Sequence, residues 1–245
     1  FVIFTFFFIS GIFFYLILRK LIDNEDFCVI STIIYLTYPY LFGQSMFSPK
    51  DIPFLSVWLM CTYLVFNLID KLIRNDILNN KEIMLISFCT AFLLSIRIAG
   101  LLIFIQYLLL LIFYTSVFEK KLSSFVKRFY PKFLIFSLFF LLFTFLFYPI
   151  LWLEPFLIFE TVNINTNHFN NVGTNTLGKI MYSHDLPSTY IPIWLSVKLP
   201  LIILIGFLII PFCEKKIFND KKKSIFFGSL LLTVLLIPLI LIIKK

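Results

Sequence analysis

Two adjacent ionisable residues, Lys50 and Asp51, stand in a polar segment, residues 42–54, that separates two strongly apolar runs. Charged side chains at a membrane surface are costly and commonly mark a functional site. Pro49 and Pro53 restrict the backbone on both sides of the pair, which suits the positioning of a ligand. Asp51 can equally be a helix cap at the start of the following run, and both interpretations stay open.

Two further cations lie within or beside apolar runs. Arg97 interrupts the run 83–118, and its guanidinium, which is always charged, needs a lipid phosphate, a protein carboxylate or a ligand phosphate as partner. Snorkelling to lipid headgroups is the alternative for this side chain. Lys198 is expected about two turns into a membrane segment, where it can bind a phosphate or pair with a carboxylate.

Polar side chains that could contact an acceptor are concentrated in residues 153–190, the largest polar segment and the expected outer-face loop. Such residues supply hydrogen bonds, and a neighbouring histidine and aspartate can also transfer protons. Ordinary polar surface is the alternative interpretation for the pair His184 and Asp185. With Gln44 from the first polar segment, these candidates are Lys179, Tyr182, His184, Asp185 and Tyr190.

Several signatures of soluble enzymes are absent from the sequence. There is no P-loop, GxGxxG, GxSxG or HExxH motif. The two histidines and the four cysteines, which lack CxxC spacing, do not indicate a metal site or a disulfide framework. No resident cofactor is predicted, and a divalent cation is the only one left open.

The composition predicts an integral membrane protein. Hydrophobic residues make up 60% of the 245 residues, charged residues make up 14%, and the mean hydropathy is +1.00, whereas a soluble domain is less apolar. We expect an all-α fold, a polytopic transmembrane helix bundle that residues 1–245 form as one domain. A span needs about 20 helical residues, which gives about eight membrane segments: 1–18, 27–43, 52–70, 83–97, 98–118, 133–152, 191–212 and 225–243.

Basic residues are distributed unevenly among the linkers. The positive-inside rule assigns the more basic linkers to the cytoplasm, so residues 42–54, Arg97 and residues 153–190 are expected on the outer face. The net charge of +8 therefore marks topology and does not indicate nucleic-acid binding. Fifteen of the 21 Lys and Arg residues fall in four of the linkers: 19–20, 71–81, 120–132 and 215–223.

The ends of the sequence predict a fragment. The chain starts at Phe1 without an initiator methionine and enters an apolar run at once, and it ends at Lys245 directly after another run. We expect that a longer protein contains this chain, with an N-terminal span and a first outer loop before Phe1.

Four stretches, in order, resemble one enzyme family. Phe42-Gly-Gln-Ser-Met-Phe-Ser-Pro-Lys-Asp-Ile-Pro-Phe54 resembles the FGHSFxNPKDxPF pattern of polyprenyl-phosphate-sugar-dependent glycosyltransferases. This family has the membrane-embedded class C fold and is related to protein O-mannosyltransferases (glycosyltransferase family 39). The three other stretches are similar to its LxxRIxG, PxLWxxP and GKxY…LPWYYxP…KxP patterns: Leu94–Gly100, Tyr148–Pro155 and Gly178–Pro200.

The sequence departs from the family pattern at a few positions. Gln44 stands where the family has His, Ser48 replaces Asn, and Ser188-Thr189 replaces Trp-Tyr. These changes affect residues that could set donor or acceptor specificity. The catalytic carboxylate of the family belongs to its first outer loop, so the resemblance implies that the general base lies upstream of Phe1 and that the catalytic residue is not in this chain.

The resemblance implies an integral membrane glycosyltransferase. Such an enzyme moves a hexosyl or pentosyl group, with inversion, from a polyprenyl-phosphate carrier to an acceptor hydroxyl of a glycan, lipid or protein. Its expected place is the periplasmic face of a bacterial inner membrane, in cell-envelope glycosylation, or else the lumenal face of the endoplasmic reticulum. A transporter or flippase of lipid-linked saccharides, or a non-catalytic paralogue, is the alternative. The expected donor-phosphate residues are Lys50, Asp51, Arg97 and Lys198.

Overall fold

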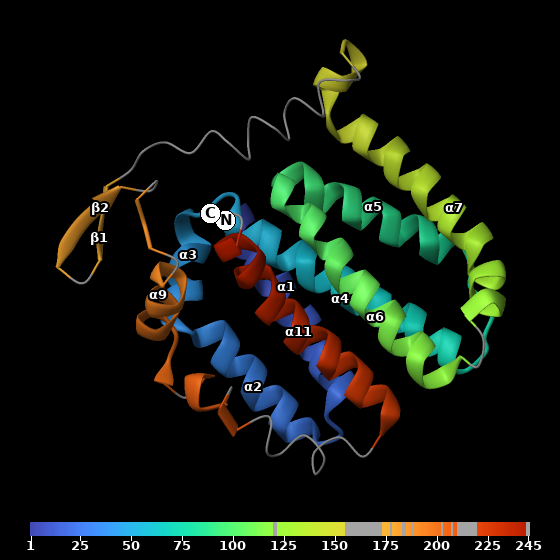
Figure 1. Cartoon of the computed structure of the whole chain (residues 1–245), viewed down its shortest axis with the longest axis horizontal. Helices are drawn as coiled ribbons and strands as arrows, with labels where there is room; N and C mark the ends of the chain where they lie inside the picture. Colours follow the sequence, from blue (N-terminus) through green and yellow to red (C-terminus); the bar gives the residue numbers. More distant parts are fainter. Residues whose placement is uncertain are drawn as a thin grey trace.

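The computed structural model describes residues 1–119, 122–154, 173–176, 178–182, 185–187, 189–201, 203–206, 208–209 and 220–243. These residues are almost entirely helical, which confirms the predicted all-α class, with one small β-hairpin in addition (Figure 1). The elements are α1 (Val2–Leu21), α2 (Glu25–Thr37), α3 (Pro39–Phe47), α4 (Asp51–Ile73), α5 (Asn80–Ile96), the 3-10 helix η1 (Ile98–Leu102), α6 (Ile103–Phe118), α7 (Leu122–Phe147), the 3-10 helix η2 (Pro149–Trp152), β1 (Gly173–Thr176), β2 (Lys179–Tyr182), α9 (Tyr190–Lys198) and α11 (Lys221–Ile243).

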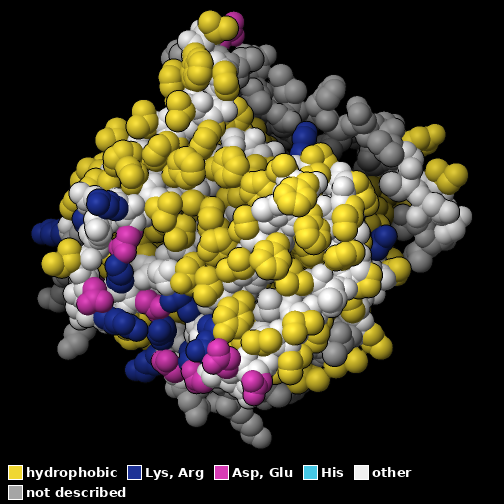
Figure 2. Space-filling view, turned by 180° about the vertical axis from the view of Figure 1, so that it is seen from behind, with side chains coloured by type: hydrophobic (Ala, Val, Ile, Leu, Met, Phe, Trp, Pro, Cys, Tyr) yellow, Lys and Arg dark blue, Asp and Glu magenta, His cyan; other side chains and the backbone are white. Residues whose placement is uncertain are grey.

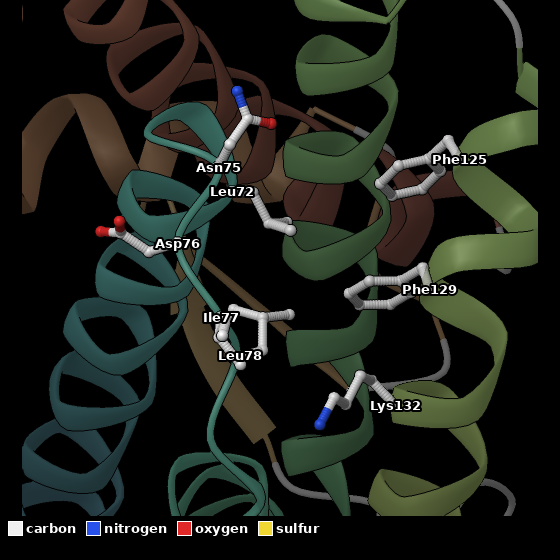
Figure 3. Close-up of a pocket in the computed structure, with 8 residues that line it drawn as sticks. All are labelled: Leu72, Asn75, Asp76, Ile77, Leu78, Phe125, Phe129 and Lys132. Atoms are coloured by element: carbon white, nitrogen blue, oxygen red, sulfur yellow. The ribbon is translucent and has the colours of Figure 1, made fainter.

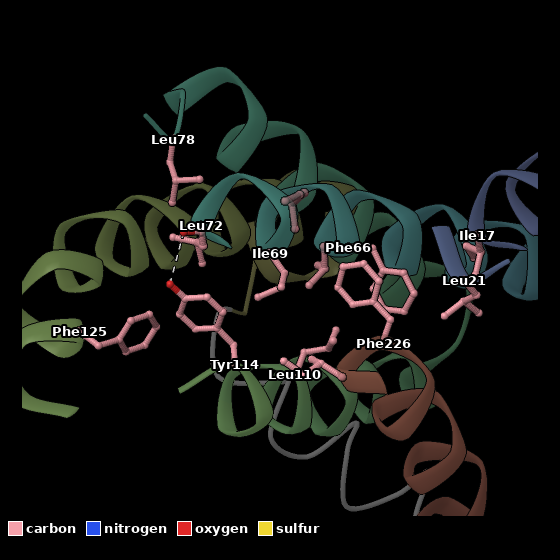
Figure 4. Packing of buried hydrophobic residues seen from close by; sticks show 13 residues of the cluster. Ile17, Leu21, Phe66, Ile69, Leu72, Leu78, Leu110, Tyr114, Phe125 and Phe226 are labelled. Atoms are coloured by element: carbon pink, nitrogen blue, oxygen red, sulfur yellow. Dashed lines mark hydrogen bonds between the residues drawn. The ribbon is translucent and has the colours of Figure 1, made fainter. Parts of the chain in front are cut away.

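Helix α4 lies at the centre of the bundle, with α1, α6 and α11 alongside it and the α5–α7 pair on one flank (Figure 1). Its side chains Phe66 and Ile69 are fully buried, and the Phe66 ring stacks on Phe226 of α11 with 4.2 Å between the ring centroids (Figure 4). Leu110 of α6 completes this part of the core. Between membrane helices such close packing is a main source of stability, because lipid tails are as apolar as the side chains.

Four helical segments in the described part of the chain are long and apolar enough to cross a membrane, namely Val2–Leu21, Asp51–Ile73, Ile98–Phe118 and Phe129–Phe147. The bent pair α2–α3 makes a fifth if it counts as one span. These helices support a membrane protein, and the predicted number of eight segments is not confirmed.

The predicted span 27–43 is two helices that meet at an angle of 54°. The bend lies at Tyr38, whose backbone is extended at ψ 117°, because the residue before a proline is disfavoured in the α conformation. The second helix, α3, continues to Phe47. The segment 42–54 is therefore not one polar loop as the sequence suggested: only Ser48, Pro49 and Lys50 connect two helices.

The predicted helix break at Arg97 is confirmed. Helix α5 ends at Ile96, Arg97 is extended at φ −151° and ψ 139°, and η1 follows before α6 begins. Gly100 permits this geometry, since a Cβ atom there would lie only 2.9 Å from the backbone nitrogen of Leu94. A side chain at this position would push η1 away from the end of α5.

Most charged side chains gather at one end of the molecule, which we call the basic end (Figure 2). Linkers that were assigned to one side of the membrane meet there. Lys71 of α4 pairs with Glu82 of α5, Lys132 of α7 donates to Asn80 Oδ1 at 2.7 Å, and Lys223 of α11 pairs with Asp23 after α1. The described parts of the basic linkers therefore lie together at one end of the bundle, as the charge pattern predicted.

Among the described residues of the basic end, Asp70 is the most deeply buried charged residue. Its side chain is 11% exposed. Its Oδ2 forms an ion pair with Lys20 of α1, and its Oδ1 lies 2.9 Å from Nζ of Lys222 of α11. Both lysines also lie near an aromatic ring, Lys20 by Tyr63 and Lys222 by Phe226. The sequence interpretation did not single out this three-helix contact, because Asp70 is an ordinary acidic residue at the end of an apolar run.

The long outer segment contains regular structure. Strands β1 and β2 form an antiparallel hairpin in which Gly173 pairs with Tyr182 and Thr176 with Lys179, and Gly178 turns the chain with φ +78°. Residues 155–172 lie outside the described part. The expected span 191–212 contains α9, which ends at Lys198 because Leu199, before Pro200, is extended at ψ 139°.

The two ends of the bundle should face opposite sides of the membrane. We expect cysteines introduced at Arg74, exposed in the α4–α5 linker, and at Asn175, exposed in the hairpin, to react with a membrane-impermeant maleimide from opposite sides. The physical reason is the clustering of basic linkers at one end. The measurement is labelling of intact cells and of inverted vesicles, in a full-length variant whose natural cysteines are replaced by alanine. Labelling of both positions from the same side would contradict this topology.

Candidate functional site

An ion pair joins two of the candidate residues at the end opposite the basic end. Arg97 Nη1 lies 2.7 Å from Asp51 Oδ1. Asp51 is the first residue of α4, and Arg97 is the extended residue that ends α5. The helix break thus turns the guanidinium toward the start of α4. Of the three partners that the sequence left open for Arg97, the structure has the protein carboxylate.

Ser48 supports the same carboxylate from the other side. Its hydroxyl donates a hydrogen bond to Asp51 Oδ2 at 2.9 Å, and its own side chain is buried. Both Asp51 oxygens are therefore engaged. The Asp51 and Arg97 side chains are still 53% and 46% exposed, so a ligand can reach the pair.

Asp51 is not the N-cap residue of α4. That position is Lys50, which makes no side-chain capping bond, and Asp51 is the first residue inside the helix. The interpretation of Asp51 as a plain capping residue is wrong in this respect. Its negative charge still lies at the positive end of the helix dipole, which is favourable.

Lys50 is the unpaired cation beside this ion pair. Its side chain is exposed and, among the residues that the structure describes, forms no hydrogen bond or ion pair. Gln44 lies one turn before the end of α3, half-buried, and its backbone carbonyl accepts the Ser48 N–H at 2.9 Å. The charges of Asp51 and Arg97 cancel, so the group of Lys50, Asp51 and Arg97 has a net charge of about +1, which comes from Lys50.

The residues that directly follow α7 lie in the same region. The hydroxyl of Tyr148 donates to the Leu94 carbonyl in the last turn of α5 at 2.7 Å. Trp152 of η2 donates to the Phe145 carbonyl at 2.8 Å, and these two bonds hold the corner that follows α7 beside Arg97.

Lys198 is not joined to the ion pair. It is the exposed last residue of α9, and its Nζ lies 5.1 Å from the centre of the Trp194 ring. Its backbone carbonyl accepts a hydrogen bond from Tyr38 Oη at 3.3 Å, which places α9 beside the bend between α2 and α3. The expected continuous helix through Lys198 is not present, because α9 ends at this residue and Leu199, before Pro200, is extended.

The other candidate contacts are scattered along the hairpin and the turn that follows it. Lys179 and Tyr182 are exposed on β2, and the backbone N–H of Asp185 donates to the Tyr182 carbonyl at 2.9 Å. Tyr190 begins α9. His184 lies outside the described residues. In the described part of the chain, these side chains make no hydrogen bond or ion pair with Asp51 or Arg97.

The described residues contain no group of three or more His, Cys, Asp and Glu side chains that could hold a metal ion. Comparison with family models, with curated proteins and with solved structures finds no match to this chain. The candidate site consists of the half-exposed Asp51–Arg97 ion pair, the buried Ser48 that positions it, and Lys50, which has no partner among the described residues.

The close approach at Gly100 gives a stability test of the helix break. Gly100→Ala should lower the stability of the full-length protein by roughly 1–3 kcal/mol, because the new methyl group meets backbone atoms of Leu93 and Leu94 that cannot move independently. Thermal unfolding in detergent measures this.

Gly43→Ala is the matched control for the Gly100 variant. A Cβ atom at Gly43 has no heavy atom within 4 Å, and Ala is favoured over Gly within a helix by about 1 kcal/mol. This variant should be as stable as the parent or more so. Equal stability of the two variants would show that the break does not depend on close packing at Gly100.

Proposed function

We propose that the chain belongs to an integral membrane glycosyltransferase that takes its sugar from a polyprenyl-phosphate carrier. The observation that supports this most is the Asp51–Arg97 pair with Lys50 next to it. The pair joins two of the stretches that resemble the family patterns, 42–54 and 94–100, which are far apart in the sequence. A lipid-linked donor has its phosphate at the membrane surface, at the level where an end of the bundle meets the headgroups.

The proposed chemistry assigns different roles to the three residues. The acceptor hydroxyl attacks the anomeric carbon of the sugar, the bond from that carbon to the phosphate oxygen breaks, and the polyprenyl phosphate leaves with the electron pair. Lys50 stabilises the negative charge on the leaving phosphate. Arg97 keeps further N–H donors besides the one bound to Asp51, and these can orient a phosphate oxygen.

Asp51 is a positioning residue in this proposal. Because both of its oxygens already accept contacts from Ser48 and Arg97, it is poorly placed to remove the proton of the acceptor. That proton goes to a general base, which in the family that the chain resembles is a carboxylate of the first outer loop. Lys198 of α9 and the hairpin residue Lys179 are proposed as further contacts of the donor or acceptor.

Removal of the unpaired charge should impair use of the donor. We expect Lys50→Gln to lower kcat/KM for the polyprenyl-phosphate sugar about 10–100-fold. The reason is that the variant loses one charge-assisted contact to the phosphate, which is worth roughly 1.5–3 kcal/mol. The measurement is sugar transfer by the full-length protein in proteoliposomes. Lys81→Gln, an exposed lysine at the basic end, is the control and should transfer normally. Unchanged transfer by a well-expressed Lys50→Gln protein would refute the assignment.

The ion pair should act as one unit. We expect Asp51→Asn and Arg97→Gln each to reduce transfer strongly, and the double variant to be no worse than the poorer single variant, because residues in direct contact are not additive. Stability should fall by less than about 1 kcal/mol, as for other exposed pairs. Additive losses of transfer would mean that the two residues act separately, and unaltered transfer would reduce the pair to a structural contact.

A transporter or flippase of lipid-linked saccharides is the second candidate. The α2–α3 bend of 54° and the break at Arg97 favour it, because discontinuous helices commonly form the substrate sites of transporters. The same proteoliposomes distinguish the two functions. A transferase attaches the labelled sugar to an acceptor hydroxyl, whereas a transporter moves the intact labelled lipid between leaflets without transfer.

A further inference from the structure

An apolar cleft opens between α6 and the α5–α7 pair, with α4 as its floor. It has a volume of about 340 Å³, and the described side chains that line it are apolar or aromatic except for Lys132. Phe104 of α6 touches Phe136 and Phe140 of α7 at ring-centroid distances of 6.3 and 5.4 Å. These ring contacts close the cleft toward the Arg97 end.

A second hollow lies next to this cleft at the basic end. Its volume is about 450 Å³, and its lining includes the α4–α5 linker and the side chains Phe125, Phe129 and Lys132 of α7. Figure 3 shows these three side chains pointing from α7 toward the linker, while Asp76 on the opposite wall points away from them. Phe129 and Lys132 line both hollows, so the apolar cleft adjoins a hollow whose described lining also contains the polar residues Asn75 and Asp76.

Lys132 is available to an anion. Its Nζ donates to Asn80 Oδ1 at 2.7 Å, and within the described ranges no carboxylate forms an ion pair with it. An amide oxygen leaves the positive charge of the ammonium group uncompensated. Basic side chains at the level of the headgroups attract anionic lipids by about 1 kcal/mol each.

The size of the cleft selects a hydrocarbon chain over a helix of a partner protein. A helix is about 10–12 Å wide with its side chains, so a piece only 10 Å long fills roughly 900 Å³, far more than the cleft provides. A single acyl chain is thin enough to enter between α6 and α7, and its glycerophosphate group would then lie at the level of Lys132.

We propose that this composite cavity binds an anionic phospholipid of the leaflet at the basic end. One acyl chain lies in the cleft between α6 and α7, and the phosphate lies on Lys132 in the second hollow. The lipid adds apolar contacts between α7 and the helices α4 and α6 that line the cleft with it. This site lies at the end of the bundle opposite Lys50, and it does not depend on the proposed glycosyl transfer.

Native mass spectrometry of the full-length protein tests this proposal, with phosphatidylglycerol and phosphatidylcholine of identical acyl chains as probes. We expect one phosphatidylglycerol to be retained at least tenfold better than phosphatidylcholine. Lys132→Gln should remove this preference. Leu108→Trp, which places a larger side chain at an exposed position that lines the cleft, should lower retention of both lipids about tenfold.

Two matched variants control for general effects of charge and bulk. Lys127→Gln removes an exposed lysine of α7, and Leu138→Trp enlarges an exposed leucine of α7; neither residue is among those described as lining the cleft. Both should retain phosphatidylglycerol as the parent does. Equal retention of the two lipids by the parent protein, or undiminished retention by Lys132→Gln and Leu108→Trp, would overturn the proposal. Thermal unfolding of each variant verifies that it is folded.

Discussion

The bundle depends on one buried carboxylate, that of Asp70. A membrane offers no water to a charged group, so a buried charge has to find its partners within the protein. Lys20 and Lys222 both form ion pairs with Asp70, and these ion pairs fix the position of α1 and of α11 along the axis of α4. Phe66 lies one turn before Asp70, and its partner Phe226 lies one turn after Lys222, so the ion pair and the stacked rings specify the same register of two antiparallel helices.

Helix α4 carries a second aspartate at its other end, and the two have different environments. Asp70 is almost inaccessible, whereas Asp51 is half exposed and meets Arg97 at the surface. The 23 residues of α4 extend about 34 Å at 1.5 Å per residue, close to the hydrocarbon thickness of about 30 Å. The same helix thus places a structural charge cluster at one membrane surface and an accessible ion pair at the other.

Hydropathy and charge were sufficient to predict the helical class, the gathering of the basic linkers and the break at Arg97, because each is a local consequence of residue type. The bend at Tyr38 was missed, although Pro39 signals it, since the apolar run continues through it. The helix end at Lys198 was missed for the same reason. The partners of Arg97 and Asp70 could not be predicted, because they depend on which distant helices become neighbours.

The neutral ion pair explains how a cationic site can persist at a membrane surface without a ligand. An unpaired arginine at this depth would need an anion at all times, whereas Arg97 is already neutralised by Asp51 and can offer its remaining donors without losing that contact. Lys50, exposed and on a flexible stem, can stay in water until a phosphate arrives. If the proposed glycosyl transfer holds, a neutral pair beside an exposed lysine therefore suits a donor phosphate that has to bind and leave better than a permanently occupied anion site would.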